Sequence, residues 1–256
     1  MAASLRVSNG LGVVIMGREQ QVRKAANEGI SALRRGRRDE AATHFDEALA
    51  LCDDLEPALT RRGELSSLSL LFQQAGFGDL ALAAAQDALD IVKAEGRTDL
   101  LGGDLLAVGN AHQTLGNTTA AIALFEEALA LCIAQERWAD AASASTNIAG
   151  LAFNEGNQDR AFALLKQSLD FLARNPFPHT EIQTRFLLMQ GLEITKGDLD
   201  LALANAKQLV TLLGEMPHDQ REMTLRFIDR MTDRYLAERP QPAGKLWKIL
   251  QFPQLG

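Results

Sequence analysis

The residues best suited to chemistry are two cysteines that end nearly identical phrases. Residues 45–52 read FDEALALC, residues 125–132 read FEEALALC, and the chain has no other cysteine than Cys52 and Cys132. A redox pair, half of a metal site and a sequence duplication all predict this coincidence. A disulfide needs Cα atoms within about 7 Å. Which of the three explanations holds therefore depends on how far apart the fold places the two segments.

Other catalytic and ligand patterns are missing from the sequence. It has no Gly-x-Ser-x-Gly, no His-Glu-x-x-His, no phosphate-binding glycine loop and no Cys-x-x-Cys. The four histidines, His44, His112, His179 and His218, are scattered along the chain. We therefore expect a protein that is not an enzyme and uses no metal or cofactor.

Composition favours an elongated helical protein over a β-rich core. Hydrophobic residues make up 46% of the 256 residues but aromatic residues only 5%, so alanine and leucine dominate. The net charge of −7 argues against a nucleic-acid surface. No apolar run approaches the roughly 18–20 residues of a membrane span, and no clear secretion signal is present. These features predict a cytoplasmic protein.

A period of about 40 residues organises the sequence, which is within the range of helical repeat arrays. A glycine precedes each similar stretch at this constant spacing, with one extra residue before the last copy. Small or apolar residues follow each glycine at positions that form one stripe of an α-helix, as in Ala41, Phe45, Ala48 and Cys52. A second helical stretch precedes each glycine. The repeating unit is therefore helix A, a glycine turn and helix B, and its glycines are Gly36, Gly76, Gly116, Gly156 and Gly197.

The repeat explains why the two cysteines end nearly identical segments. They extend the helix B stripe at the place that Val92, Leu172 and Leu213 fill in the other copies. The two cysteines are four helices apart, and packed helices lie about 8–10 Å from one another, so roughly 30 Å separates them. We interpret both as core residues, and we expect valine at both positions to cost less than about 1.5 kcal/mol.

This pattern resembles the tetratricopeptide repeat (TPR), in the longer variant of kinesin light chains and bacterial signalling regulators. The turn glycine, the small–aromatic–small stripe and the small helix A residues Gly29, Gly109 and Ala149 carry the resemblance. It implies an all-α, right-handed α-solenoid of five repeats at 18–56, 57–96, 97–136, 137–175 and 180–214. It also implies a core position for His112, where the family usually has a packing aromatic residue.

Three further features lie towards the ends of the array. NPFPH at 175–179 is expected to absorb the one-residue slip in the period, and Thr180 with Gln183 reads as a capping box that restarts the helix. A capping helix is expected at 218–239, with Phe227, Ile228, Met231 and Tyr235 on its apolar side. Tails at 1–17 and 240–256 remain, and the second could dock on the array or on a second copy of the chain.

The family resemblance implies that the helix A faces line a concave groove. Polar residues gather at the places that point inward, and asparagine amides offer both donors and acceptors to an extended peptide. A solvated wall without a function is the alternative. The expected partner-binding residues are Arg23, Asn27, Arg34, Gln74, Asn110, Gln113, Thr114, Asn147 and Asn154, joined in the second and fourth repeats by Ser66, Ser67, Gln73, Ser143 and Thr146.

The expected function is therefore a scaffold or adaptor that binds a protein or peptide. The carboxylate clamp of some relatives is absent, because its basic and amide places fall on Ala26, Ile30, Ser67, Gly103 and Ala107. The alternative is a peptide-sensing signalling regulator of the bacterial quorum-sensing type. An enzyme would need a site assembled from distant residues.

Overall fold

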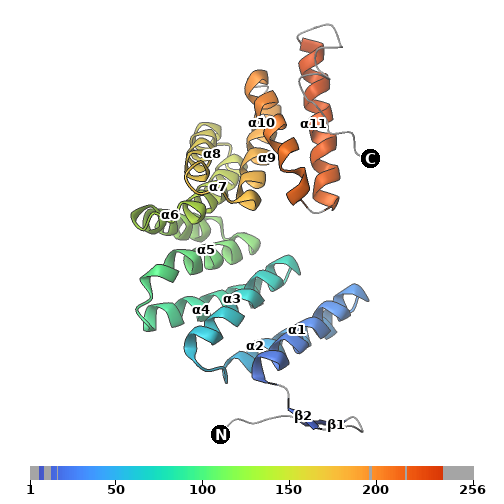
Figure 1. Ribbon diagram of the computed structural model, residues 1–256, viewed down its shortest axis with the longest axis vertical. Helices are drawn as coiled ribbons and strands as arrows, with labels where there is room; N and C mark the ends of the chain where they lie inside the picture. Colours follow the sequence, from blue (N-terminus) through green and yellow to red (C-terminus); the bar gives the residue numbers. More distant parts are fainter. Residues whose placement is uncertain (1–5, 9–12, 16, 196–197, 217, 239–256) are drawn as a thin grey trace. The chain divides into compact units, whose positions relative to one another are not determined.

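A computed structural model describes residues 6–8, 13–15, 17–195, 198–216 and 218–238 of the chain (Figure 1). It divides into two compact units, residues 1–135 and 136–256. Within the described ranges, no helix is both long enough and apolar enough to cross a membrane. The predicted all-α repeat fold is confirmed, because helices follow one another as packed pairs throughout.

The first unit contains a short hairpin and three helix pairs. Strands β1 (Arg6–Ser8) and β2 (Val13–Ile15) pair antiparallel, with Val7 opposite Val14. This hairpin was not expected from the sequence. The helix pairs are α1 (Arg18–Arg34) with α2 (Arg38–Cys52), α3 (Ala58–Gln74) with α4 (Gly78–Ala94), and α5 (Thr98–Thr114) with α6 (Thr118–Ala134).

The described part of the second unit contains two helix pairs and a further helix. Its elements are α7 (Trp138–Asn154), α8 (Gln158–Leu172), α9 (Pro178–Ile194), α10 (Leu199–Thr211), the 3-10 turn η1 (Leu213–Glu215) and α11 (His218–Glu238). Helix α7 packs on α8, α9 on α10, and α11 on α10. Ile228 of α11 is fully buried. The side chains of Phe227, Met231 and Tyr235, and the tail from residue 239, lie outside the described residues.

The turn glycines are required by the backbone. Those at the first four turns have φ between 74° and 78°, a left-handed conformation that side chains with a Cβ rarely adopt. Gly197, the fifth, lies outside the described residues. The link between one pair and the next uses the same conformation at Gly96 (φ 63°), whereas Glu136, at the next such link, adopts it with a φ of 57° despite its side chain.

Small residues on helix A leave space into which large side chains of helix B pack. A Cβ built on Gly29 would lie 2.3 Å from Cε1 of Phe45, and one on Gly109 would lie 2.5 Å from Cε1 of Phe125. Both phenylalanines are fully buried. The close approach expected from the small residues of helix A is therefore present in the first and third pairs.

The two cysteines are core residues, as predicted. Cys52 and Cys132 are thiols with 0% exposure, each at the buried face of its helix. Burial raises the pKa of the Cys52 thiol to about 12, and the charge of Glu64 adds to this effect. A thiol that stays protonated at neutral pH is a poor nucleophile and a poor metal ligand.

Two predictions about the fourth and fifth repeats were wrong. Helix α9 begins and ends in the same register as α7, so NPFPH does not absorb the slip in the period. The extra residue falls between α9 and α10, because α10 begins one residue past the register that α8 sets. Thr180 is the third residue of α9 rather than its cap. Its buried hydroxyl lies 2.8 Å from that of Ser143 on α7.

Each unit also has polar groups in its core. In the first, the carboxylate of Asp104 on α5 is 1% exposed and accepts hydrogen bonds of 3.0 and 2.5 Å from Nε and Nη2 of Arg62 on α3. In the second, the buried hydroxyls of Thr146, Ser168 and Thr184 lie within 2.7–3.0 Å of one another and connect α7, α8 and α9. We call these three residues the hydroxyl triangle.

Candidate partner-binding surfaces

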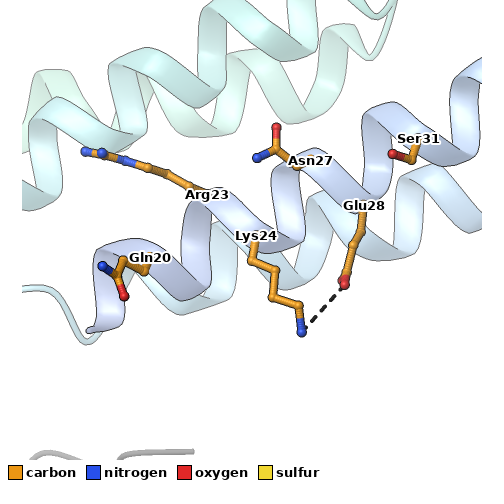
Figure 2. A pocket seen from close by; sticks show the side chains of 6 residues that line it. All are labelled: Gln20, Arg23, Lys24, Asn27, Glu28 and Ser31. Atoms are coloured by element: carbon orange, nitrogen blue, oxygen red, sulfur yellow. Dashed lines mark ion pairs between the residues drawn. The ribbon is translucent and has the colours of Figure 1, made fainter. Parts of the chain in front are cut away.

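Two of the three expected groove residues of α1, Arg23 and Asn27, line a shallow hollow of about 370 Å³ (Figure 2). Asn27 is exposed there, and Arg23 extends from α1 towards α3. Nη2 of Arg23 lies 2.5 Å from Oε1 of Glu64 on α3. Arg23 is therefore paired within the unit, so its guanidinium has less hydrogen-bonding capacity and charge available for a partner. The lining residues are Gln20, Arg23, Lys24, Asn27, Glu28 and Ser31.

The remaining expected residues of the first unit lie near the ends of the A helices. Arg34, Gln74 and Thr114 are the last residues of α1, α3 and α5, and all three are exposed. The Thr114 hydroxyl donates to the carbonyl of Asn110 at 3.0 Å, so it is satisfied within its own helix. Gln113 is exposed, and Asn110 is half-buried on α5.

The expected row of asparagines is divided between the two units. Asn110 belongs to the first unit, whereas Asn147 and Asn154 belong to α7 in the second. Asn147 is half-buried, and Asn154 is exposed at the end of α7. Asn110 and Asn147 therefore lie in different units, and each unit presents its own polar residues.

Asn154 lies at a pocket of about 180 Å³ in the second unit, which we call the α7–α9 pocket. Its apolar walls include Phe153, Leu187 and Ile194, and its polar groups include the amides of Asn154 and Gln190. The sequence analysis identified only Asn154 among these residues. The complete lining is Gly150, Phe153, Asn154, Gln158, Leu187, Gln190, Gly191, Ile194 and Thr195.

Two glycines keep this pocket open. A Cβ on Gly191 would lie 2.4 Å from Cζ of Phe153, whereas one on Gly150 would have only Leu187 near it, at 3.8 Å. Phe153 is held edge-on against Phe162 with ring centroids 5.3 Å apart. Ile194 is 74% exposed although it is a large aliphatic residue. The Phe153 wall is therefore held in place, while Ile194 presents apolar surface to solvent.

Several polar side chains expected in the groove make hydrogen bonds within their own unit. Thr146 is buried in the hydroxyl triangle, and Ser143 bonds to Thr180. The hydroxyls of Ser66 and Ser67 donate to carbonyls four residues earlier in α3. His112 was expected in the core but is only half-buried, with Nδ1 3.4 Å from Nδ2 of Asn117.

One group within the described ranges has the spacing of a metal site. It joins Glu28 of α1 to His44 and Glu47 of α2. No sequence motif indicates this group, because its members come from two helices and only His44 and Glu47 are close in sequence.

Comparison with known proteins agrees with this architecture. Residues 103–174 match the tetratricopeptide repeat family. A comparison with curated proteins found no match. Among solved structures, a Rap protein complexed with competence and sporulation factor has a TM-score of 0.64 at 14% identity, covering 88% of this chain and 66% of the Rap chain.

Two further structures have the same fold. The apo form of RapI has a TM-score of 0.61 at 13% identity, over 88% of this chain and 66% of its own. A kinesin-light-chain-type protein of Podosopora anserina with nearly identical TPR-like repeats has a TM-score of 0.50 at 14% identity, over 88% of this chain and 100% of its own. The chain thus spans 66% of the length of the two Rap proteins.

The fold and these surfaces define a helical tandem-repeat protein. The segment that matches the tetratricopeptide repeat model covers α6, α7 and α8 with most of α5, and the helix-pair fold is similar to that of the Rap and kinesin-light-chain-type structures. The helix pairs outside that segment follow the same plan.

Proposed function

We propose that this protein is a non-enzymatic scaffold that binds an extended segment of a protein or peptide. The α7–α9 pocket carries the proposal, since it combines apolar walls with amides at its rim. At about 180 Å³ it is smaller than the roughly 300–1,000 Å³ of typical small-molecule sites. It suits one apolar side chain of a bound segment, while Asn154 and Gln190 hydrogen-bond to the backbone beside it.

The other exposed polar residues of the A helices contribute contacts along the segment in this proposal. They include Asn27 and Arg34 on α1 and Gln113 on α5, whereas Arg23 contributes less because it is paired with Glu64. We propose a cytoplasmic location, which agrees with two cysteines that remain thiols.

A second candidate is a peptide-sensing signalling regulator, and the likeness to the Rap complex favours it. The two candidates differ in the ligand. A scaffold binds a segment within a larger protein, whereas a sensor binds a short free peptide and transmits its presence to an effector.

The test has two stages. Affinity capture with mass spectrometry identifies the partner, and titration calorimetry then compares variants that retain native helicity. Gly150→Leu should fill the pocket and weaken binding at least tenfold. Gly63→Leu is the matched control, because Gly63 is an exposed glycine in α3 with no atom within 4 Å of a Cβ.

The asparagines provide a second arm of the test. Replacing Asn110 and Asn147 together by alanine should weaken binding of the same partner. If affinity survives both this double variant and Gly150→Leu, the peptide-binding proposal is wrong.

A further inference from the structure

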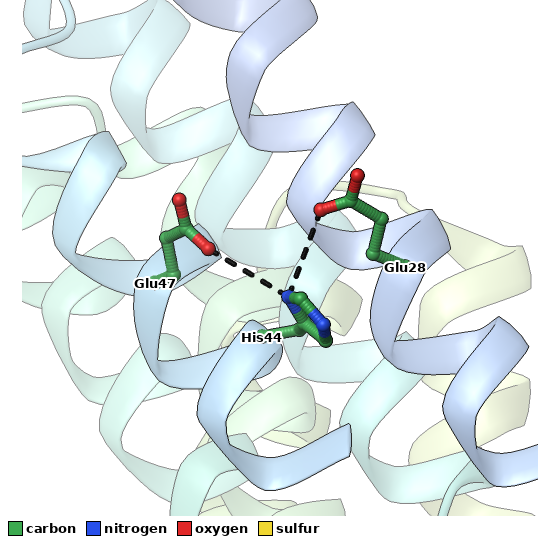
Figure 3. Close-up of side chains that lie close together, drawn as sticks. All are labelled: Glu28, His44 and Glu47. Atoms are coloured by element: carbon green, nitrogen blue, oxygen red, sulfur yellow. Dashed lines mark ion pairs between the residues drawn. The ribbon is translucent and has the colours of Figure 1, made fainter. Parts of the chain in front are cut away.

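The imidazole of His44 faces two carboxylates in the first helix pair (Figure 3). Its Nδ1 lies 3.6 Å from Oε2 of Glu28 on α1 and 3.7 Å from Oε2 of Glu47 on α2. His44 and Glu47 are three residues apart and so share one face of α2. The three potential ligand atoms all lie within 4.8 Å of one another.

This nitrogen has no hydrogen-bond partner among the described residues, although solvent does not reach it. Both carboxylate distances exceed the 2.7–3.2 Å or so of an N–H···O hydrogen bond. A buried polar atom without a partner costs free energy. The three atoms are therefore close enough to surround a small ion, but the carboxylates are too far from Nδ1 to form hydrogen bonds with it.

A zinc ion fits this space. Zn–N and Zn–O bonds are about 2.0–2.2 Å, so tetrahedral ligands lie roughly 3.3–3.5 Å from each other. The separations of 3.6 and 3.7 Å between Nδ1 and the two carboxylates require these side chains to close by only a few tenths of an ångström, and the two carboxylate oxygens lie within 4.8 Å of each other. Mg²⁺ and Ca²⁺ prefer oxygen ligands, so the imidazole nitrogen disfavours them.

The other repeats lack the equivalents of Glu28 and His44, although Asp87 and Glu127 stand at the place of Glu47. Where the first repeat has Glu28, the others have buried aliphatic residues, and where it has His44, only Asn205 is polar. An exposed helix face needs polar residues, which accounts for a glutamate but not for two carboxylates that converge on one buried nitrogen. The equivalents of Glu28 are Leu68, Val108, Ile148 and Leu188, and those of His44 are Ala84, Leu124, Leu164 and Asn205.

We propose that Glu28, His44 Nδ1 and Glu47 bind one Zn²⁺, with water as the fourth ligand. The ion joins α1 to α2 and stabilises the first repeat, because ligands from two helices are held together only in the folded state. Lys24 does not block the site: its Nζ lies 3.6 Å from Oε1 of Glu28, which leaves Oε2 for the ion.

Titration calorimetry of the full chain with Zn²⁺ near neutral pH tests the site. We expect one Zn²⁺ per chain with micromolar affinity, a higher Tm with zinc, and no comparable binding of Mg²⁺. His44→Gln should lower the affinity at least about 100-fold, and Glu47→Gln at least about tenfold. Co²⁺ should give a visible spectrum that His44→Gln abolishes.

Two controls separate this site from unspecific zinc binding. His112→Gln removes another half-buried histidine, and the double variant Cys52→Val, Cys132→Val removes both thiols; neither should change the affinity. Circular dichroism verifies that each variant is folded. The proposal is overturned if the wild-type chain binds no stoichiometric Zn²⁺ at millimolar concentrations of the ion, or if His44→Gln binds it as tightly as the wild type.

Discussion

The contact between Gly109 and Phe125 predicts a strong coupling between the two positions. A Cβ at residue 109 would lie 2.5 and 2.7 Å from two ring carbons of Phe125, about 1 Å closer than carbon atoms pack favourably. The ring is fully buried and cannot turn away. Such overpacking costs about 1–3 kcal/mol, offset by up to about 1 kcal/mol of helix propensity, so Gly109→Ala should destabilise by roughly 1–2 kcal/mol.

The fourth repeat shows which second substitution should compensate for Gly109→Ala. It has Ala149 and Leu165, both buried, at the places of Gly109 and Phe125. Phe125→Leu alone should cost about 1–2 kcal/mol through the cavity it leaves. In the double variant the alanine methyl fills part of that cavity, so the double should be at least about 1 kcal/mol more stable than the sum of the single changes predicts.

Urea denaturation followed by circular dichroism measures these free energies of unfolding, and hydrogen exchange in α5 and α6 gives a local readout. Gly63→Ala is the control, since a Cβ at Gly63 meets no atom within 4 Å and should stabilise by about 0.5–1 kcal/mol. The packing argument is refuted if the single costs add within about 0.5 kcal/mol, or if Gly109→Ala stabilises as Gly63→Ala does.

Three other changes have expected results. Arg62→Met should destabilise by about 3–5 kcal/mol in chemical denaturation, because it leaves the buried carboxylate of Asp104 without its counter-charge; a cost below about 1 kcal/mol would contradict this. Glu136→Gly should raise the free energy of unfolding by about 0.5–1 kcal/mol by removing a side chain from a left-handed backbone, and an unchanged Tm would count against that strain. The pKa of Cys52 is raised to about 12, so the unfolded chain loses this proton first as pH rises above about 9. The stability of wild type relative to Cys52→Val should therefore fall by about 1.4 kcal/mol per pH unit between about 9 and 12, and a constant difference would exclude the shift.

The sequence predicted those features that depend on local pattern. Turn glycines with positive φ, and helix faces with residues such as Phe45 and Cys52, follow from backbone sterics and helical periodicity, and both are visible in one sequence. The place of the one-residue slip was missed because the prolines before α9 suggested a break there, whereas the burial of Leu188 and Met189 keeps α9 in register with α7.

Features that depend on distant residues were not predictable. Arg62 and Asp104 are 42 residues apart, and charged pairs at that separation leave no periodic signal. The carboxylate of Glu28 meets His44 only after α1 and α2 pack. Likewise, polar residues at helix A places looked equivalent in sequence, yet Thr146 is buried whereas Asn154 is exposed, since a neighbouring helix covers only one of them.

The hydroxyl triangle gives the second unit a property that alanine and leucine surfaces lack. Helices with smooth aliphatic faces can slide along one another by a turn and still bury similar area. Thr146, Ser168 and Thr184 can meet at one axial position only, because hydrogen bonds of 2.7–3.0 Å tolerate little displacement. The triangle therefore fixes the axial register of α7, α8 and α9. It thereby also fixes the position of the α7 wall of the α7–α9 pocket relative to the α9 wall.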